Sequence, residues 1–451
     1  MFWDLEKYSS STAVILPDGS CFTYGELAEL ADRFSCTVPS GRSLLFLLVE
    51  NNLESIAAYL GCLRHGHVPL LLSANTNMEQ LQLLERIYQP DAVWSARDGL
   101  RVCRHDKTEL NPELALLLST SGSTGSPKLV RLSAKNLNSN ADSIVEYLEI
   151  DASEKAVTIL PMNYTYGLSV INSHLAAGAT LLLTDYTVIQ REFWDFFKKF
   201  GGTSLVGVPY TYQIYRRAGV FTKLELPTLR YMTQAGGKLP ADDVFKVATW
   251  CKEHNVRFYV MYGQTEATAR MSYLPPERTL EKSASVGIAI PGGRFAIEDE
   301  GHREISQSGI DGELIYYGPN VSLGYAENRE DLALPDFNHG RLSTGDVARW
   351  DDEHYVYITG RLKRFIKITG NRIGLDEVEK RLRAHGLDVV CSGKDDLLAA
   401  AVTSGNPEDV VRIISEEFKI HYSMVKVIVV PEIPRNDSGK ILYTELFGGI
   451  L

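Results

Sequence analysis

Short apolar runs alternate with amphipathic stretches over the first 359 residues of this 451-residue chain. The first example is an apolar run at 43–49, a helical pattern at 53–63 and a second apolar run at 68–72. The alternation recurs further on, with apolar runs at 157–160, 180–183 and 204–208 and helical patterns at 168–175 and 193–200. Strands that alternate with helices of about 10 to 15 residues indicate largely parallel sheets covered by helices. The sequence therefore predicts an α/β fold.

Two later regions depart from this pattern. Between residues 287 and 325 the pattern changes to short β-rich pieces separated by Gly, Pro and Asp, which predicts a small, mainly antiparallel β subdomain. Its expected strands are 294–298, 312–317 and 355–358. The chain then ends in an expected α+β unit with helices at 375–382 and 407–418 and strands at 397–402 and 425–430. Because the length exceeds one hydrophobic core, we expect a large domain at 1–359 and a small domain at 360–451.

Composition excludes several classes of protein. The net charge of -11 argues against general nucleic-acid binding. The longest apolar runs, such as 44–49, are far too short to span a bilayer, and the amino terminus lacks the pattern of a secretory signal. The six cysteines are scattered singly, without the spacing of metal ligands. We therefore expect a cytoplasmic protein with no membrane span and no structural zinc.

A polar, glycine-rich loop follows the apolar run at 114–118 and ends in Pro127 and Lys128. Backbone N–H groups can approach an anion closely at Gly122 and Gly125, which lack a Cβ, and Lys128 adds positive charge. Further donors are the hydroxyls of Thr120, Ser121, Ser123 and Thr124. The loop is either a solvated surface loop or a phosphate site, and the lysine favours the phosphate site.

The loop lacks the spacing of a P-loop NTPase. That motif needs Gly at 127 and Ser or Thr at 129, where this chain has Pro127 and Leu129. A different architecture is therefore expected to bind the nucleotide.

Five separated segments resemble the adenylate-forming superfamily of acyl-CoA synthetases, adenylation domains of peptide synthetases and luciferases. The segments are the loop at 120–128, YGQTE at 262–266, STGD at 343–346, the stretch at 360–372 and the loop at 434–440. Weaker similarities are FTYGEL at 22–27 and the turn formed by Ala235, Gly236 and Gly237. The five segments occur in the order of the family, and the resemblance extends over nearly the whole chain.

The resemblance implies a two-step ligase reaction. A carboxylate attacks the α-phosphate of ATP, pyrophosphate leaves, and a thiol then displaces AMP; such catalysis depends mainly on positioning and electrostatic stabilisation. The resemblance assigns the β- and γ-phosphates to the glycine-rich loop and the α-phosphate to Thr265. Glu266 is expected to bind Mg²⁺, a cation that favours oxygen ligands. Tyr262 is expected to cover the adenine, with Gly263 and the turn at 235–237 beside the nucleotide.

The resemblance also assigns roles to the carboxy-terminal part of the chain. Asp346 is expected to accept hydrogen bonds from the ribose hydroxyls, and Arg361 and Arg372 to approach the ribose and phosphates. Lys440 is expected to bridge the carboxylate and the α-phosphate. Because the family rotates its small domain between the half-reactions, a hinge is expected at Lys363.

The substrate acid is predicted from the segment at 161–168. Amino-acid-activating relatives place an Asp where this chain has Thr165, and burying an unpaired ammonium is costly. A fatty or aryl acid is therefore favoured over an α-amino acid. The candidate pocket residues are Tyr164, Thr165, Tyr166, Gly167, Val208, Pro209, Tyr210, Ala235, Met261 and Gln264.

The acceptor thiol is either CoA or the phosphopantetheine of an acyl carrier protein. The basic residues between Arg361 and Arg372 would steer either anionic partner. CoA is favoured because the segment at 161–168 resembles acyl-CoA synthetases. Other possibilities are transfer to a nitrogen nucleophile, a luciferase-like monooxygenase and a non-catalytic sensor of acyl-adenylates. The sequence thus predicts an ATP- and Mg²⁺-dependent acid–thiol ligase.

Overall fold

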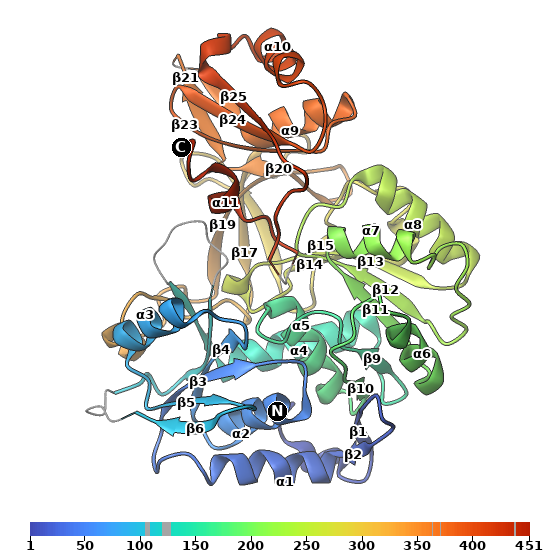
Figure 1. Cartoon of the computed structure of the whole chain (residues 1–451), viewed down its shortest axis with the longest axis vertical. Helices are drawn as coiled ribbons and strands as arrows, with labels where there is room; N and C mark the ends of the chain where they lie inside the picture. The colour runs from blue at the N-terminus through green and yellow to red at the C-terminus, as the bar shows by residue number, and fades with distance from the viewer. Residues whose placement is uncertain (104–108, 120–127, 363, 370, 437–438) are drawn as a thin grey trace. The chain divides into compact units, whose positions relative to one another are not determined.

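The structure of the chain, a computed structural model, describes residues 1–103, 109–119, 128–362, 364–369, 371–436 and 439–451 (Figure 1). The described residues form two compact units. The first unit consists of residues 1–103, 109–119, 128–295 and 316–342, and the second of residues 296–315 and the described residues from 343 to the end. Within the described residues, no helix combines the length and the apolar character needed to cross a bilayer.

The first unit contains a seven-stranded sheet in the order β18-β8-β7-β4-β3-β5-β6. Its strands are β3 (Leu44–Val49), β4 (Val68–Ser73), β5 (Ala92–Ser95), β6 (Gly99–Val102), β7 (Leu114–Ser119), β8 (Leu129–Ser133) and β18 (Gly324–Ala326). The central pairs β4–β7, β3–β4 and β3–β5 are parallel, and the outer pairs are antiparallel. The parallel strand β3 reads LLFLLV because both of its faces are covered.

A nine-stranded sheet in the same unit has the order β15-β14-β13-β12-β11-β9-β10-β1-β2. Its strands are β1 (Thr12–Ile15), β2 (Cys21–Thr23), β9 (Lys155–Val157), β10 (Thr180–Leu182), β11 (Ser204–Gly207), β12 (Tyr231–Gln234), β13 (Arg257–Tyr262), β14 (Ser272–Leu274) and β15 (Ile288–Ala289). The pairs from β1 to β13 are parallel, and β2, β14 and β15 are antiparallel at the two edges.

Within the described residues of this unit, eight α-helices cover these sheets. They are α1 (Tyr24–Ser35), α2 (Leu53–Arg64), α3 (Met78–Tyr88), α4 (Ala134–Leu148), α5 (Thr165–Ala176), α6 (Arg191–Phe200), α7 (Pro209–Arg217) and α8 (Ala241–Glu253). Helices α4 and α5 lie between the strands of the two sheets (Figure 1). Alternate residues of β3 serve different cores: Leu45 and Leu47 join the core around α4 and α5, while Leu44 and Phe46 join the core around α3. This division follows from the two-residue period of a strand.

The second unit contains most of a four-stranded sheet, β16-β17-β19-β20, and a three-stranded sheet, β23-β24-β25. The first sheet consists of β16 (Arg294–Glu298), β17 (Gly312–Tyr317), β19 (Arg341–Trp350) and β20 (Val356–Arg361). The rest of the unit consists of the hairpin β21 (Phe365–Ile368) and β22 (Asn371–Gly374), then α9 (Leu375–Ala384), β23 (Val389–Lys394), β24 (Leu397–Val402), α10 (Pro407–Phe418), β25 (Val425–Val429) and α11 (Tyr443–Phe447). Helices α9 and α10 pack on one face of the three-stranded sheet, and α11 packs on the other.

The observed elements confirm the predicted α/β class and correct several details. The expected strand at 157–160 is instead β9 at Lys155–Val157, because the following apolar residues pack against α5 without continuing the strand. The prediction also omitted β19 and β23. The expected boundary at residue 359 stays a prediction, since compactness does not show which part moves as a domain.

A buried histidine on α5 gives the first testable prediction. His174 is 2% exposed; its Nδ1 lies 2.7 Å from the Val170 carbonyl and its Nε2 lies 3.1 Å from the Tyr231 hydroxyl. Burial lowers the pKa of His174 to about 4, and the positive charge of Arg270 acts in the same direction. The neutral ring therefore donates from Nδ1 and accepts at Nε2.

The unfolded chain binds a proton at this histidine below pH of about 6.5, whereas the folded chain binds it only below about 4. The free energy of unfolding therefore decreases by up to about 3 kcal/mol as the pH falls from about 6.5 to about 4. Above pH of about 6.5 this histidine does not change the free energy of unfolding with pH. Urea unfolding at several pH values should show that His174→Gln flattens this dependence. The same change at the exposed His254 should leave it intact, and equal slopes in all three proteins would contradict the argument.

Candidate active site

The turn after β13 carries the YGQTE segment. β13 ends at Tyr262, and the short 3-10 helix η2 (Thr265–Ala267) begins three residues later. A Cβ on Gly263 would lie 1.8 Å from the backbone oxygen of Ala269, so this turn requires glycine. The side-chain amide of Gln264 donates to the Tyr262 hydroxyl at 3.2 Å, and this bond orients the Gln264 side chain. The turn thus holds Thr265 and Glu266 at the carboxyl end of a parallel strand, where ligands bind in α/β sheets.

Glu266 and Lys128 meet at one tyrosine. The Tyr325 hydroxyl donates to Oε1 of Glu266 at 2.6 Å, and the Lys128 ammonium lies 5.9 Å from the centre of the Tyr325 ring. Lys128 also pairs with Oε1 of Glu327 at 2.5 Å. Burial raises the pKa of Tyr325, and the Glu266 carboxylate raises it further, so the phenol stays a proton donor. Antiparallel pairing of β8 with β18 brings Lys128 to this position.

The first turn of α5 lies against Thr265. Thr165 is the first residue of this helix, and its hydroxyl oxygen is 3.4 Å from that of Thr265. A helix N-terminus carries partial positive charge from its unpaired N–H groups. The side chain of the preceding Tyr164 makes no cap. This end of α5 therefore presents N–H donors next to the residue expected to contact the α-phosphate.

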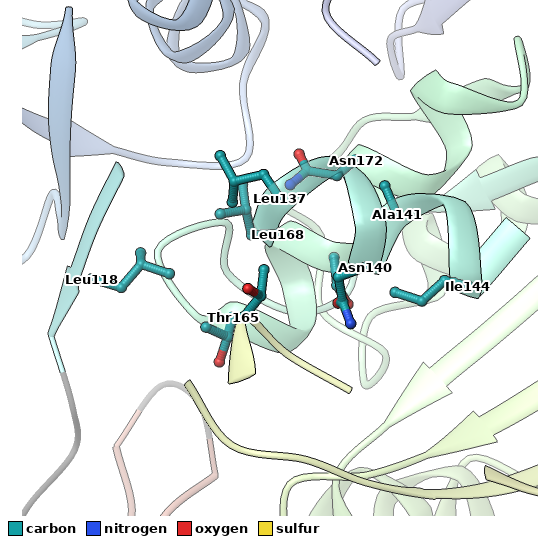
Figure 2. Close-up of a pocket in the computed structure, with 10 residues that line it drawn as sticks. Leu118, Leu137, Asn140, Ala141, Ile144, Thr165, Leu168 and Asn172 are labelled. Atoms are coloured by element: carbon teal, nitrogen blue, oxygen red, sulfur yellow. The ribbon is translucent and has the colours of Figure 1, made fainter. Parts of the chain in front are cut away.

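A narrow cavity lies between β7, α4 and α5 (Figure 2). Its polar lining residues include Asn140, Thr165, Ser169 and Asn172, and Leu118 and Leu168 contribute apolar surface. Thr165 is the predicted pocket residue found in this lining. Other predicted residues lie in the neighbouring core; they are Tyr166, Val208, Ala235 and Met261.

The remaining predicted pocket residues and the turn predicted to lie beside the nucleotide have different surroundings. A Cβ on Gly167 would lie 2.3 Å from the Pro161 carbonyl, so glycine lets α5 begin close to this backbone. Gly236, at φ +79°, leaves no space for a Cβ because the Tyr164 hydroxyl would be 2.3 Å away. Gln234 supports the same turn by donating to the Gly237 carbonyl at 2.8 Å. Pro209 opens α7, whereas the next residue, Tyr210, is exposed.

In the second unit, Asp346 and Arg361 form a direct ion pair. They are opposite residues of β19 and β20, and Nε of Arg361 donates to Oδ1 of the buried Asp346 at 2.8 Å. The Asp346 amide also donates to the hydroxyl of Thr344 at 3.1 Å. Asp346, the residue predicted to bind the ribose, and Arg361, predicted to approach the ribose and phosphates, therefore contact each other directly.

Lys440 is half-buried in a loop closed by backbone contacts. Its amide donates to the side-chain oxygen of Asn436 at 3.0 Å, and the Asn436 amide donates back to the Lys440 carbonyl at 2.9 Å. Arg435 donates to the Gly439 carbonyl at 3.0 Å. These contacts fix the backbone at Lys440, at the base of its long side chain.

Several predicted residues lie outside the described part of the chain. They are Thr120, Ser121, Gly122, Ser123, Thr124, Gly125 and Lys363. Arg372 lies on β22 opposite Lys367, and its side chain is also outside the description. Their expected roles stay predictions.

Two residues at this site were not predicted. Tyr325 gives no motif signal, because its role depends on strand pairing between distant segments. Arg270 is 2% exposed and lies over the Tyr166 ring, 4.6 Å from its centre. A single arginine within a largely apolar stretch, between Ala267 and Leu274, was the available signal.

The residues present fit a magnesium ion that is bound together with a nucleotide. Among the described residues, no three His, Cys, Asp or Glu side chains lie close enough to form a complete metal site. Mg²⁺ commonly takes one or two carboxylates together with substrate phosphates and water. The oriented carboxylate of Glu266 suits this kind of binding.

Comparison with known proteins identifies the family. The model of the AMP-binding enzyme family matches residues 84–326, more than half of the chain. An oxalate–CoA ligase of Arabidopsis thaliana is 29% identical over 72% of this chain and 66% of its own length. A 2-succinylbenzoate–CoA ligase of Bacillus cytotoxicus is 25% identical over 89% of this chain and 87% of its own length. The chain thus spans about two thirds of the plant relative and most of the bacterial one.

Solved structures share the fold. O-succinylbenzoate coenzyme A synthetase (MenE) from Bacillus subtilis, in complex with AMP, has a TM-score of 0.80 at 22% identity and covers 99% of this chain and 98% of its own. ATP-bound MatB from Rhodopseudomonas palustris has a TM-score of 0.79 at 23% identity, with the same coverage. The predicted fold is confirmed, and the predicted class of acid–CoA ligase agrees with the names of the relatives. The chain belongs to the AMP-binding enzyme family.

Proposed function

We propose that the chain is an ATP-dependent carboxylic acid ligase that forms an acyl-adenylate and then passes the acyl group to a thiol, with CoA favoured. The observation that carries this proposal is the meeting of Lys128 and Glu266 at Tyr325, beside the turn that holds Thr265. A cation from the end of the glycine-rich loop and an oriented carboxylate suit a triphosphate bound with Mg²⁺.

In the first step, an oxygen of the acid forms a bond to the α-phosphorus as the bond to pyrophosphate breaks. The loop from Thr120 to Lys128 would hold the β- and γ-phosphates, and Thr265 the α-phosphate. Glu266 would hold Mg²⁺, which neutralises phosphate charge. In the second step, the thiolate sulfur bonds to the acyl carbon and AMP leaves.

The second unit would supply the remaining groups. Asp346, already paired with Arg361, would accept hydrogen bonds from the ribose, and Lys440 would neutralise charge between the two reacting anions. Rotation of a small domain about Lys363 between the two steps is part of this proposal. The fixed backbone around Lys440 supports a defined position for the lysine.

The acid is proposed to lack an α-amino group. Thr165 contacts Thr265 and offers no negative charge for an ammonium. Relatives are named for acids as different as oxalate, 2-succinylbenzoate and long-chain fatty acids, so their names leave the acid open. A cytoplasmic location and a carrier protein as alternative acceptor belong to the same proposal.

A pyrophosphate-release assay tests the function. Fatty, aryl, hydroxy, dicarboxylic and amino acids are each tested with ATP and Mg²⁺, with and without CoA or a carrier protein. A thiol ligase should release pyrophosphate with a matching acid and form a thioester only when a thiol is present. Full product release without thiol would favour a nitrogen acceptor, and no release with any acid would reject the ligase.

Lys440→Ala should separate the two half-reactions. Loss of the cation between two anions should slow adenylation about 100- to 1,000-fold, while a supplied acyl-adenylate should still react with thiol. Rapid-mixing assays of each step measure this difference. Lys426→Ala, at an exposed lysine of the same unit, is the control. Equal losses in both steps would contradict the assigned role.

Tyr325→Phe should lower the affinity of the enzyme for Mg²⁺. Without the hydroxyl, Glu266 loses the donor that orients its carboxylate, and such losses commonly weaken metal affinity about 10- to 100-fold. The Mg²⁺ concentration for half-maximal pyrophosphate release should rise by about this factor. Tyr422→Phe, at an exposed tyrosine, should not change it, and an unchanged value for Tyr325→Phe would remove Tyr325 from the site.

A further inference from the structure

Arg270 is a buried charge without a matching acid. Its side chain is 2% exposed, and among the described residues no carboxylate forms an ion pair with it. Its Nη1 donates to the Tyr147 hydroxyl at 3.0 Å and contacts Sδ of Met261 at 2.8 Å, and its Nη2 donates to Oγ of Ser169 at 3.0 Å. Neutral partners only partly replace water, so the buried charge remains costly.

One nitrogen of this guanidinium has no partner at all. Nε of Arg270 is buried and makes no hydrogen bond within the described residues. Nε and Nη2 lie on the same edge of the planar group, and Nη2 has a second N–H besides the one given to Ser169. This edge is the fork that a carboxylate accepts through two parallel bonds.

A second buried arginine shows what a purely structural role requires. Arg131 is fully buried, and its Nε, Nη1 and Nη2 donate to backbone carbonyls of residues 323, 325, 334 and 335. Every nitrogen of Arg131 therefore has an acceptor. Arg329 is also buried with an unpaired Nε, but its Nη2 lies 3.7 Å from the Asp91 carboxylate. Arg270 has neither a full set of acceptors nor a carboxylate partner among the described residues, and such a buried donor needs an explanation.

The contacts of Arg270 include two residues that line the cavity between β7, α4 and α5. Ser169, which accepts from Nη2, lines the cavity of Figure 2, and Asn140, another lining residue, donates to the Arg270 backbone carbonyl at 2.9 Å. The guanidinium also lies over Tyr166, a predicted pocket residue. Arg270 does not itself line the cavity, but its guanidinium contacts one lining residue, Ser169, and its backbone contacts another, Asn140.

The distance between Arg270 and the reacting end of the acid follows from the positions of two residues on helix α5. Thr165 contacts Thr265, the expected α-phosphate residue, and Ser169 contacts Arg270. Residues four apart lie one helical turn apart, about 6 Å along the axis. A group bound at Arg270 would thus lie only a few bonds from the reacting carboxylate, which favours a short acid.

We propose that Arg270 binds a second carboxylate of the substrate, so that the chain activates short dicarboxylic acids. This inference rests on the proposed ligase function and narrows it from uncharged fatty or aryl chains to acids with a second negative charge. The carboxylate would accept from Nε and Nη2 of Arg270, and the Ser169 hydroxyl would lie beside it.

Binding to the full-length protein tests Arg270 independently of turnover. Malonate, succinate and glutarate are each compared with their monomethyl esters by calorimetry in the presence of a non-hydrolysable ATP analogue. A bidentate charged contact predicts that the best diacid binds about 10- to 100-fold more tightly than its ester. This comparison uses the unchanged protein and therefore does not depend on whether any variant folds.

Arg270→Met should remove the preference, because it keeps the length of the side chain without its charge. Arg270→Lys keeps the charge but loses the fork, so it should retain only part of the preference. Arg216→Met, at an exposed arginine of the same unit, is the matched control and should behave as the wild type. A purely structural role for Arg270 would weaken diacid and ester equally.

Two results would overturn the inference: equal binding of diacid and ester by the wild type, or an unchanged ratio in a folded Arg270→Met. The pyrophosphate assay then separates this failure from failure of the ligase function. Turnover of monoacids without preference for diacids would keep the ligase and reject the role of Arg270. No pyrophosphate with any acid would reject the ligase, while the binding ratio would still decide whether Arg270 is a carboxylate site.

Discussion

The packing of α4 and α5 between two sheets is the constraint on which the first unit depends. Each sheet has a parallel centre, and parallel strands need cover on both faces. One core joins Leu45 and Leu47 of β3, the inner faces of the two helices, and residues of the nine-stranded sheet such as Val206. Because this core fixes α5 against both sheets, it also fixes the start of α5 next to the turn after β13.

The same core contains an unusual concentration of polar groups. His174, Tyr166 and Arg270 are all buried around α5, and each polar group removed from water must find partners or remain costly. His174 is satisfied as a neutral ring, and the Tyr166 hydroxyl lies 2.7 Å from that of Thr233. Arg270 is the member of this group with an unpaired nitrogen. This unpaired nitrogen is one of the observations behind the proposed role of Arg270 in ligand binding.

The local sequence pattern was sufficient to predict the bounds of several of the strands and helices. Strands β16 and β17 and helix α10 have the predicted bounds, since each has a continuous periodic pattern with turn residues at its ends. The strand predicted at 157–160 was misplaced because an apolar run buried by packing resembles a strand. Among site residues, the resemblance to the adenylate-forming superfamily implied Thr265, Glu266 and Asp346 as candidates. It did not identify Tyr325, whose contact with Glu266 spans 59 residues of sequence.

The sequence by itself determined the α/β class, the family resemblance and the identity of the chemical groups, because periodicity and motif spacing are local properties of the chain. Tertiary structure alone decided which of these groups meet. Pairing of β8 with β18 brings Lys128 to Tyr325, whose hydroxyl donates to Glu266, and the contact of α5 with the β13 turn brings Thr165 to Thr265. Tertiary packing also decided that Arg270 is buried without a carboxylate partner among the described residues, since burial depends on all the elements packed around a side chain.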